Sequence, residues 1–219
     1  MHALLLATLA AATLPWAVPA WAQDASEGTA SSDNAATAEE PAAVAEMAQG
    51  AEDAPVTVIE YGSFTCPHCA AWHEESYPQL KEEFIDEGSV RFVFREVYFD
   101  RPGLWASMVA RCGGEMRFFG IHDMIYAQQS EWIGDGEGAT IAANLRTLGK
   151  TAGLDDATLE ACLNDQEQAT ALVEWYQANA EADGIEGTPT FFINGEKHSN
   201  MGWDEMRGLI EAEIAEAGQ

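Results

Sequence analysis

The sequence predicts an α/β fold in which a small sheet is interrupted by an all-helical insertion. Two runs with strand character, 55–61 and 89–99, flank a helical stretch, which is the pattern of a parallel β-α-β unit. Helical periodicity then continues over 99–183. A hairpin pattern at 188–199 and a closing helix complete a β-β-α unit. The two halves of the sheet are therefore expected to be separated in the chain by helices.

The first β-α-β unit rests on three local signals. The run PVTVIEY (55–61) is apolar and β-branched, which is typical of a buried strand. A helix is expected from Pro67 to about Asp86, with a kink at Pro78 because proline lacks the N–H that a helix interior needs. In the second strand every other residue over 90–94 is apolar and large, which indicates a buried face.

Glycines and aspartates divide the rest of the folded chain into elements. Two apolar-periodic helices are separated by the glycines at 113–114, and GDGEG (134–138) breaks the chain again. The segment DDATLEACLN is expected to start as a helix with Asp155 or Asp156 at its N-cap. The hairpin is expected to turn at the Asn-Gly pair at 194–195. A last amphipathic helix then ends the chain.

The N-terminal residues carry a pattern of export. Residues 3–14 are almost wholly apolar, and Ala20-Trp21-Ala22 is a cleavage pattern, so 1–22 is predicted to be a signal peptide. An uncleaved membrane anchor is the alternative. Residues 23–53 hold eight acids, no base and no aromatic residue, which predicts a disordered acidic tether. We expect the folded domain at 54–217, in an oxidising compartment such as the periplasm.

The charge excludes one class of partner. The formal net charge is −27, of which −19 remains on the folded part once the tether is set aside. Such a field repels nucleic acids and anionic lipids, so no nucleic-acid partner is expected. General solubility in a saline habitat explains the acidity equally well. We expect a monomer, since the tether is too short and polar to form a dimerisation domain.

The cysteine motif Cys66-Pro67-His68-Cys69 lies where the first strand ends and the first helix begins. A structural zinc site needs about four ligands, and the other cysteines, Cys112 and Cys162, are lone, so no metal is expected. A purely structural disulfide over so short a loop would constrain the unfolded chain little. A redox-active pair is the interpretation that the context favours.

The position explains how such a pair would work. A helix N-terminus carries free N–H groups and partial positive charge, which stabilise a thiolate on Cys66. Pro67 suits the first helical position, and the His68 ring can donate to the thiolate or attract it when charged. Each effect lowers the pKa of Cys66 and makes the disulfide more oxidising. Cys69, one turn further in, is expected to be the resolving thiol.

The motifs resemble those of the DsbA family of thioredoxin-fold disulfide oxidoreductases. FTCPHC follows VIEYGS, and GTPTFFINGE comes about 120 residues later with helices between. The resemblance covers about 55–217 and implies a thioredoxin fold with a helical insertion at about 99–183. It also implies a periplasmic oxidase that donates its disulfide to unfolded or reduced exported proteins and is re-oxidised by a membrane partner. No cofactor is implied.

Further residues gain expected roles from this resemblance. In the superfamily the proline that corresponds to Pro189 is cis and faces the cysteine pair, and the main chain at Thr188 pairs with an extended client. An ordinary trans proline is the alternative. The best-known oxidases carry Val where Thr188 stands, which leaves the redox poise open. Glu60 matches a buried acid that takes the proton of the resolving thiol; the alternative is an edge residue that reaches solvent.

The remaining candidates are structural. Some DsbA-like proteins carry a second disulfide in the helical insertion, and we expect one between Cys112 and Cys162 rather than two buried thiols. We expect His73 to lie on a solvated helix face and His122 to be structural.

Rival functions remain open at this point. A disulfide reductase or isomerase would use the same residues at a lower potential. A thiol-based copper or client-binding chaperone is the alternative from another class.

Overall fold

A computed structural model of the chain describes residues 44–218. The predicted signal peptide, 1–22, and residues 23–43 of the predicted tether lie outside this range. Within 44–218 no helix combines the length and the apolar character that crossing a membrane requires.

One mixed sheet forms the centre of the described residues. Its strand order is β1-β3-β2-β4-β5, with β2 and β3 parallel and the other neighbours antiparallel. The strands are β1 (Met47–Gln49), β2 (Val56–Gly62), β3 (Val90–Glu96), β4 (Thr190–Ile193) and β5 (Glu196–His198). The parallel pair β2 and β3 is the predicted β-α-β unit.

The predicted single helix after β2 is three helical segments. They are α1 (Pro67–Glu75), α2 (Tyr77–Leu80) and a π-helical turn, η1 (Lys81–Ile85). The break falls at Ser76, and Pro78 lies in the first turn of α2. Proline has no N–H to donate to a carbonyl one turn earlier, so the chain restarts a helix there instead of bending one.

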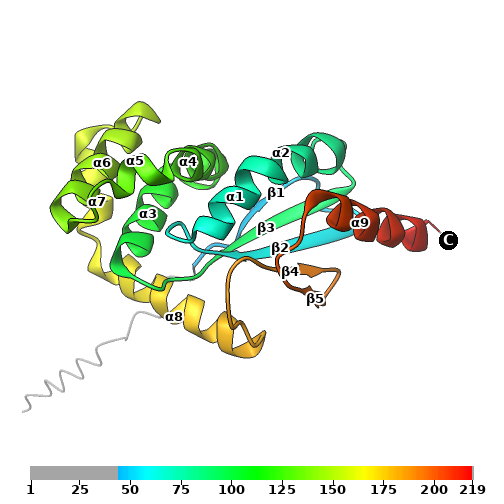
Figure 1. The fold of residues 1–219 in the computed structure, drawn as a ribbon. Coiled ribbons are helices and arrows are strands. Elements are labelled where there is room, and N and C mark those ends of the chain that lie inside the picture. Colours follow the sequence, from blue (N-terminus) through cyan, green and yellow to red (C-terminus); the bar gives the residue numbers. More distant parts are fainter. Residues whose placement is uncertain (1–43, 219) are drawn as a thin grey trace, which may run out of the picture. The chain divides into compact units, whose positions relative to one another are not determined.

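The helical insertion lies between β3 and β4 in the chain. It consists of α3 (Arg101–Cys112), α4 (Glu115–Ala127), α5 (Gln129–Ile133), α6 (Gly138–Thr151), α7 (Asp156–Leu163) and α8 (Gln166–Ala182). Figure 1 shows α3 to α7 grouped at one end of the sheet, with α8 below it. The first four residues of GDGEG (134–138) separate α5 from α6, which begins at Gly138. Asp155 caps α7 by accepting a hydrogen bond from the N–H of Thr158 at 2.8 Å.

The C-terminal unit closes the sheet. The β4–β5 hairpin turns at Asn194 and Gly195, whose φ angles of 46° and 87° are those of the expected two-residue turn. Helix α9 (Trp203–Ala217) follows and buries Met206 and Ile210 completely.

The predicted end of the tether at residue 53 is wrong. Residues 47–49 form β1, which pairs antiparallel with β3 and sets Met47 opposite Phe94. The prediction of disorder used the average composition of the whole segment. The order of 47–49 depends instead on one side chain and one edge: Met47 is buried, at 5% exposed, and β1 covers an edge of the sheet.

Two arginines of the folded unit hold this N-terminal segment. An Arg95 nitrogen lies 2.6 Å from a Glu46 carboxylate oxygen. Arg111 donates to the carbonyl oxygen of Ala45 at 2.9 Å. Glu46 is one of the acids of this segment, so the charge of the segment contributes to its order through the ion pair with Arg95.

Strand alternation decides which side chains meet α1. Val58 and Glu60 point to one face of β2, where their partners on β3 are Phe92 and Phe94. The Trp72 ring of α1 packs on this face, 6.4 Å from Phe92 between ring centroids. The carboxyl group of Glu60 is therefore carried into the layer between the sheet and the helix that bears the cysteines.

Candidate active site

Cys66 occupies the N-cap of α1. The residue has an extended backbone, with φ −79° and ψ 120°, and its sulfur accepts a hydrogen bond from the N–H of Cys69 at 3.4 Å. Pro67 takes the first helical position, where its missing N–H is not needed. Cys66 and Cys69 are both free thiols in this structure. The sulfur of Cys66 thus faces the open amide end of a helix.

This environment lowers the pKa of Cys66 to about 5. The largest cause is a hydrogen bond from the Cys69 thiol, and burial opposes it. Thr188 and the backbone N–H groups of Cys69 and His68 add further stabilisation of the thiolate. The Thr188 hydroxyl is buried without another partner among the described residues, so it is free to donate. A thiol of this kind is ionised at neutral pH.

Cys69 has the opposite character. Its side chain is fully buried, and burial raises the pKa of its thiol, with Cys66 and Glu60 adding to the effect. The pair therefore has one exchangeable thiolate and one protonated thiol.

A cis peptide bond joins Thr188 to Pro189, directly before β4. The Cys66 sulfur lies 3.4 Å from the carbonyl oxygen of Thr188, to which its thiol form can donate, so this loop lies against the cysteine pair. A pocket of about 480 Å³ runs beside it, lined by residues 186–190 and 197–199. The register of β2 with β4, in which Tyr61 faces Thr190, brings the two motifs together across some 120 residues of chain.

Glu60 is fully buried and bonds to a residue that we had placed on a solvated surface. Its Oε2 lies 2.8 Å from Nε2 of His73, whose side chain is only 3% exposed. The expectation of a solvent-facing His73 is wrong, because Ser76 ends α1 and α4 packs across this face. Burial raises the pKa of Glu60 to about 8 and lowers that of His73 to about 3. Near neutral pH the pair is an acid hydrogen-bonded to a neutral imidazole.

His122 lies beside this pair, as a fully buried residue of α4. One ring nitrogen, Nδ1, lies 2.9 Å from the Asp123 carboxylate, and burial lowers the pKa of the ring. Its ring is 4.6 Å from the His73 ring. Among the described residues, His73, His122 and Asp123 bring donor atoms within 4.8 Å of one another, a spacing that a metal ion could use. The cysteine thiols are not part of that group.

The family model described as Thioredoxin matches residues 42–212. The chain belongs to the thioredoxin family. The family match begins before β1, in agreement with the ordered segment that the sequence analysis assigned to the tether.

Individual relatives place the chain among the DsbA-like members. A Rickettsia bellii protein, provisionally named a protein-disulfide oxidoreductase, is 32% identical over 173 residues, which are 78% of this chain and 66% of that protein. Disulfide bond formation protein D of Bacillus subtilis is 28% identical and is covered to 82%, with 83% of this chain aligned. The chain spans 60% to 66% of the length of the first Rickettsia relatives.

Solved structures agree on the fold. Wolbachia pipientis α-DsbA1 superposes with a TM-score of 0.72 at 24% identity, over 78% of this chain and 92% of that one. The predicted thioredoxin fold with an all-helical insertion is confirmed, and so is the resemblance to the DsbA family.

The helical insertion of this DsbA-like chain supports the cysteine loop. The Gln129 side chain, at the start of α5, donates to the carbonyl oxygens of Phe64 at 2.8 Å and Cys66 at 3.0 Å. Sequence reasoning missed this residue because a glutamine in a helical region carries no motif.

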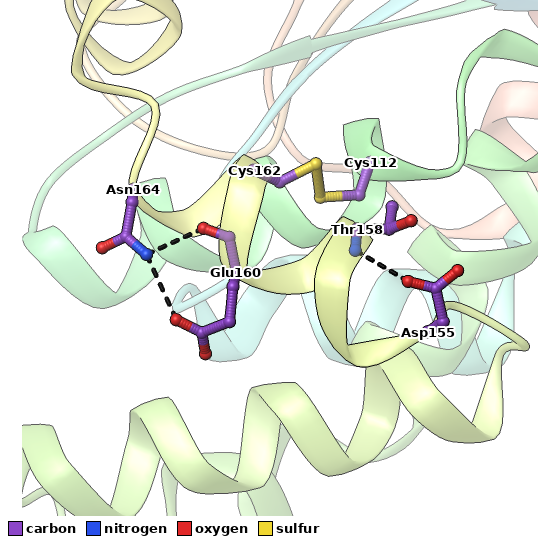
Figure 2. Close-up of a disulfide and its surroundings, with 6 residues drawn as sticks. All are labelled: Cys112, Asp155, Thr158, Glu160, Cys162 and Asn164. Atoms are coloured by element: carbon purple, nitrogen blue, oxygen red, sulfur yellow. Dashed lines mark hydrogen bonds between the residues drawn. A yellow bond between two sulfur atoms is a disulfide. The ribbon is translucent and has the colours of Figure 1, made fainter.

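The insertion also contains a disulfide. Cys112, the last residue of α3, is bonded to Cys162 of α7, with Cα atoms 5.9 Å apart. Figure 2 shows the bridge next to the Asp155–Thr158 cap of α7. Neither cysteine lies at a helix start, so nothing in their surroundings resembles that of Cys66.

The other predicted residues lie at the surface of the site. Pro67 and His68 are exposed at the start of α1. His68 contributes its backbone N–H to Cys66.

Proposed function

We propose that the protein is a thiol:disulfide oxidase that donates the Cys66–Cys69 disulfide to reduced exported proteins. The observation that carries this proposal is the low pKa of Cys66, held at a helix N-terminus beside Thr188. Stabilising the thiolate stabilises the reduced form, which makes the disulfide a stronger oxidant.

Disulfide donation needs two exchanges. A client thiolate attacks the sulfur of Cys66, the Cys66–Cys69 bond breaks, and Cys69 leaves and takes up a proton. A second client thiolate then attacks the client sulfur of the mixed disulfide, and Cys66 leaves as a stable thiolate. Glu60, with its pKa near 8, is the proposed donor of the proton to Cys69.

Re-oxidation reverses these roles. Cys66 attacks a disulfide of the re-oxidising partner, which we infer to be a membrane protein as in the DsbA family. Cys69 gives its proton to Glu60, attacks Cys66 and releases the partner's sulfur as a thiolate. The Thr188 main chain and the pocket beside Pro189 are the proposed seat of an extended client chain.

The proposed compartment follows from the same chemistry. A disulfide between Cys112 and Cys162 persists where the surroundings are oxidising. The leader pattern at 1–22 supports export to the periplasm.

The deciding measurement is the reduction potential of the Cys66–Cys69 couple. It is best made by equilibration with glutathione in the Cys112→Ala/Cys162→Ala variant, because Cys66–Cys69 is then the one cysteine pair that can be oxidised and reduced. An oxidase requires a value well above about −180 mV, and a value near about −270 mV would identify a reductase instead. An isomerase would also refold a protein with scrambled disulfides, which an oxidase does slowly. This second assay is needed because the best-known oxidases carry Val where Thr188 stands.

A further inference from the structure

The proposed function requires a proton to reach and leave a buried sulfur in every cycle. Cys69 is fully buried, and its thiol must lose its proton on re-oxidation and regain one on donation. Glu60, an acid that interacts with Cys69, is also fully buried. An acid enclosed in the protein can serve one turnover, but it must then exchange its own proton with solvent. The inference below rests on the proposed function and concerns that exchange.

Glu60 has two differently placed oxygens. Oε2 is bonded to Nε2 of His73 at 2.8 Å, while Oε1 has no partner among the residues 44–218. A Cβ atom placed on Gly62 would lie 2.8 Å from Oε1 and 3.0 Å from the Tyr126 hydroxyl, so these two groups converge beside the strand end. The Cys69 thiol interacts with both of them. Oε1 therefore faces the sulfur side and Oε2 faces His73.

His73 lies between Glu60 and a groove at the surface. Its second nitrogen, Nδ1, is buried and has no partner among the described residues. The ring is stacked on Tyr126 with centroids 4.1 Å apart and planes 11° apart, which fixes its orientation. The same residue lines a groove of about 560 Å³, whose wall includes Asp123 with a 45% exposed side chain. One imidazole thus lies between a buried acid and a groove that reaches solvent.

We propose that His73 relays protons between Glu60 and this groove. On re-oxidation the Cys69 thiol gives its proton to the Glu60 carboxylate, and its sulfur attacks Cys66 and displaces the partner's thiolate. Glu60 then passes a proton to Nε2 of His73, while Nδ1 releases a proton to water in the groove. The imidazole ends the step neutral, as the other tautomer, and Glu60 is again a carboxylate, so the net charge of the core is the same before and after the step. On disulfide donation the same steps run in reverse.

The electrostatic surroundings suit a relay. The ionisable groups near the pair come from several elements: Cys66 at the N-cap of α1, Cys69 and Glu74 of α1, Tyr77 of α2, Lys81 of η1, and His122, Asp123 and Tyr126 of α4. Burial keeps the pKa of His73 near 3, so the ring stays neutral and both nitrogens can exchange a proton. Because Glu60 accepts a proton only when ionised, the resolution step should accelerate as pH rises toward about 8.

The test separates the two steps of re-oxidation. Reduced protein is mixed with oxidised glutathione, quenched in acid at increasing times and analysed by mass spectrometry. The glutathione adduct on Cys66 reports the first step, and its decay to the oxidised protein reports attack by Cys69. His73→Gln keeps a hydrogen-bond partner for Glu60 but cannot relay. Its adduct should form at the wild-type rate and decay about a hundredfold more slowly, with the rise in rate toward pH 8 lost.

A second variant protects the test against a folding defect. His73→Ala opens space next to the groove, and added imidazole should restore adduct decay in proportion to its concentration. Tyr77→Phe is the matched control, because the Tyr77 ring packs 4.7 Å from that of His73. The glutathione adduct of this variant should decay at the wild-type rate. Decay in His73→Gln within about twofold of wild type, or failure of imidazole to rescue His73→Ala, overturns the relay. A reduction potential near about −270 mV for the wild-type Cys66–Cys69 couple would instead refute the oxidase function.

Discussion

At the scale of single residues, the chemistry depends on a contrast between two cysteines three positions apart. Cys66 caps α1, where the helix offers N–H groups to its sulfur, and its pKa falls to about 5. Cys69 lies one turn inside, fully buried, and its pKa is raised. The start of α1 thus stabilises a thiolate on Cys66 and keeps Cys69 protonated. Cys66 is therefore the attacking thiol, and Cys69 must exchange a proton in each cycle.

The first prediction concerns how pH changes the stability of the reduced form. The pKa of Cys66 is lower in the folded state than its unfolded value of about 8.5, so its contribution is full above that value and is lost as pH falls through about 5. The melting temperature of the reduced protein minus that of the oxidised protein should therefore rise between about pH 5 and 8. Calorimetry of both forms measures this difference in melting temperature. Subtracting the value of the oxidised form removes the contributions of the other titrating groups.

A flat difference over this range would contradict the low pKa of Cys66. Above about pH 8.5 the trend should reverse, because the buried Cys69 resists an ionisation that the unfolded chain allows.

Some of these residues were predictable from sequence and others were not. Cys66 and Pro189 carry motifs whose spacing from a strand end identifies them. His73 comes directly before two glutamates in a helix with weak amphipathic character, and its burial depends on α4, which packs on α1 from elsewhere in the chain. Gln129 acts through carbonyl groups of a loop some 60 residues away, and such a contact leaves no local pattern.

At the scale of elements, the short strand β1 shows how few residues decide whether a segment is ordered. The strand contributes three residues, but they cover the exposed edge of β3 and bury Met47. Arg95 and Arg111 add ion-pair and carbonyl contacts to residues just before it. The average composition of the segment predicted disorder because it does not register tertiary contacts. The free energy that orders β1 comes from its contacts with β3 and the two arginines and not from the segment itself.

Replacing Met47 should reveal the weight of that strand. Met47→Ala removes a buried side chain and should lower the free energy of unfolding by about 2–3 kcal/mol. Met116→Ala is the control, since that side chain is 99% exposed and its loss should change stability by less than about 0.5 kcal/mol. Urea titration of both variants gives the comparison; equal stabilities would mean that β1 contributes nothing.

The disulfide between α3 and α7 makes a separate prediction. It closes a loop with a sequence separation of 50, so Cys112→Ala/Cys162→Ala should lose about 4 kcal/mol of stability by chain entropy. The variant should still oxidise a dithiol peptide at close to the wild-type rate, because neither cysteine has the surroundings of Cys66. Loss of activity in a variant that remains folded would give this bridge a redox role.

At the scale of the whole molecule, two sequence-distant motifs form one site. The cysteine pair follows β2 and the cis proline precedes β4, and antiparallel pairing of these strands brings them together. The insertion between them supplies Gln129, His122 and Tyr126 to the same region. Fold order was predictable because strand and hairpin signals are local, whereas the contribution of the insertion depends on helix packing that no local pattern encodes.

The charge of the whole molecule leads to the last prediction. With 37 acids against 10 lysines and arginines, the protein should attract basic clients and repel acidic ones. Of two dithiol peptides of equal length, the lysine-rich one should be oxidised at least about tenfold faster than the glutamate-rich one at about 10 mM salt, where the screening length is about 30 Å. At about 1 M salt that length is about 3 Å and the rates should converge. Stopped-flow oxidation with a neutral peptide as reference measures the effect. Electrostatic steering acts on the encounter of protein and peptide and not on the thiols. The ratio of the lysine-rich to the glutamate-rich rate should therefore be the same in Cys112→Ala/Cys162→Ala. Equal rates for the two peptides at low salt would show that the charge serves solubility alone.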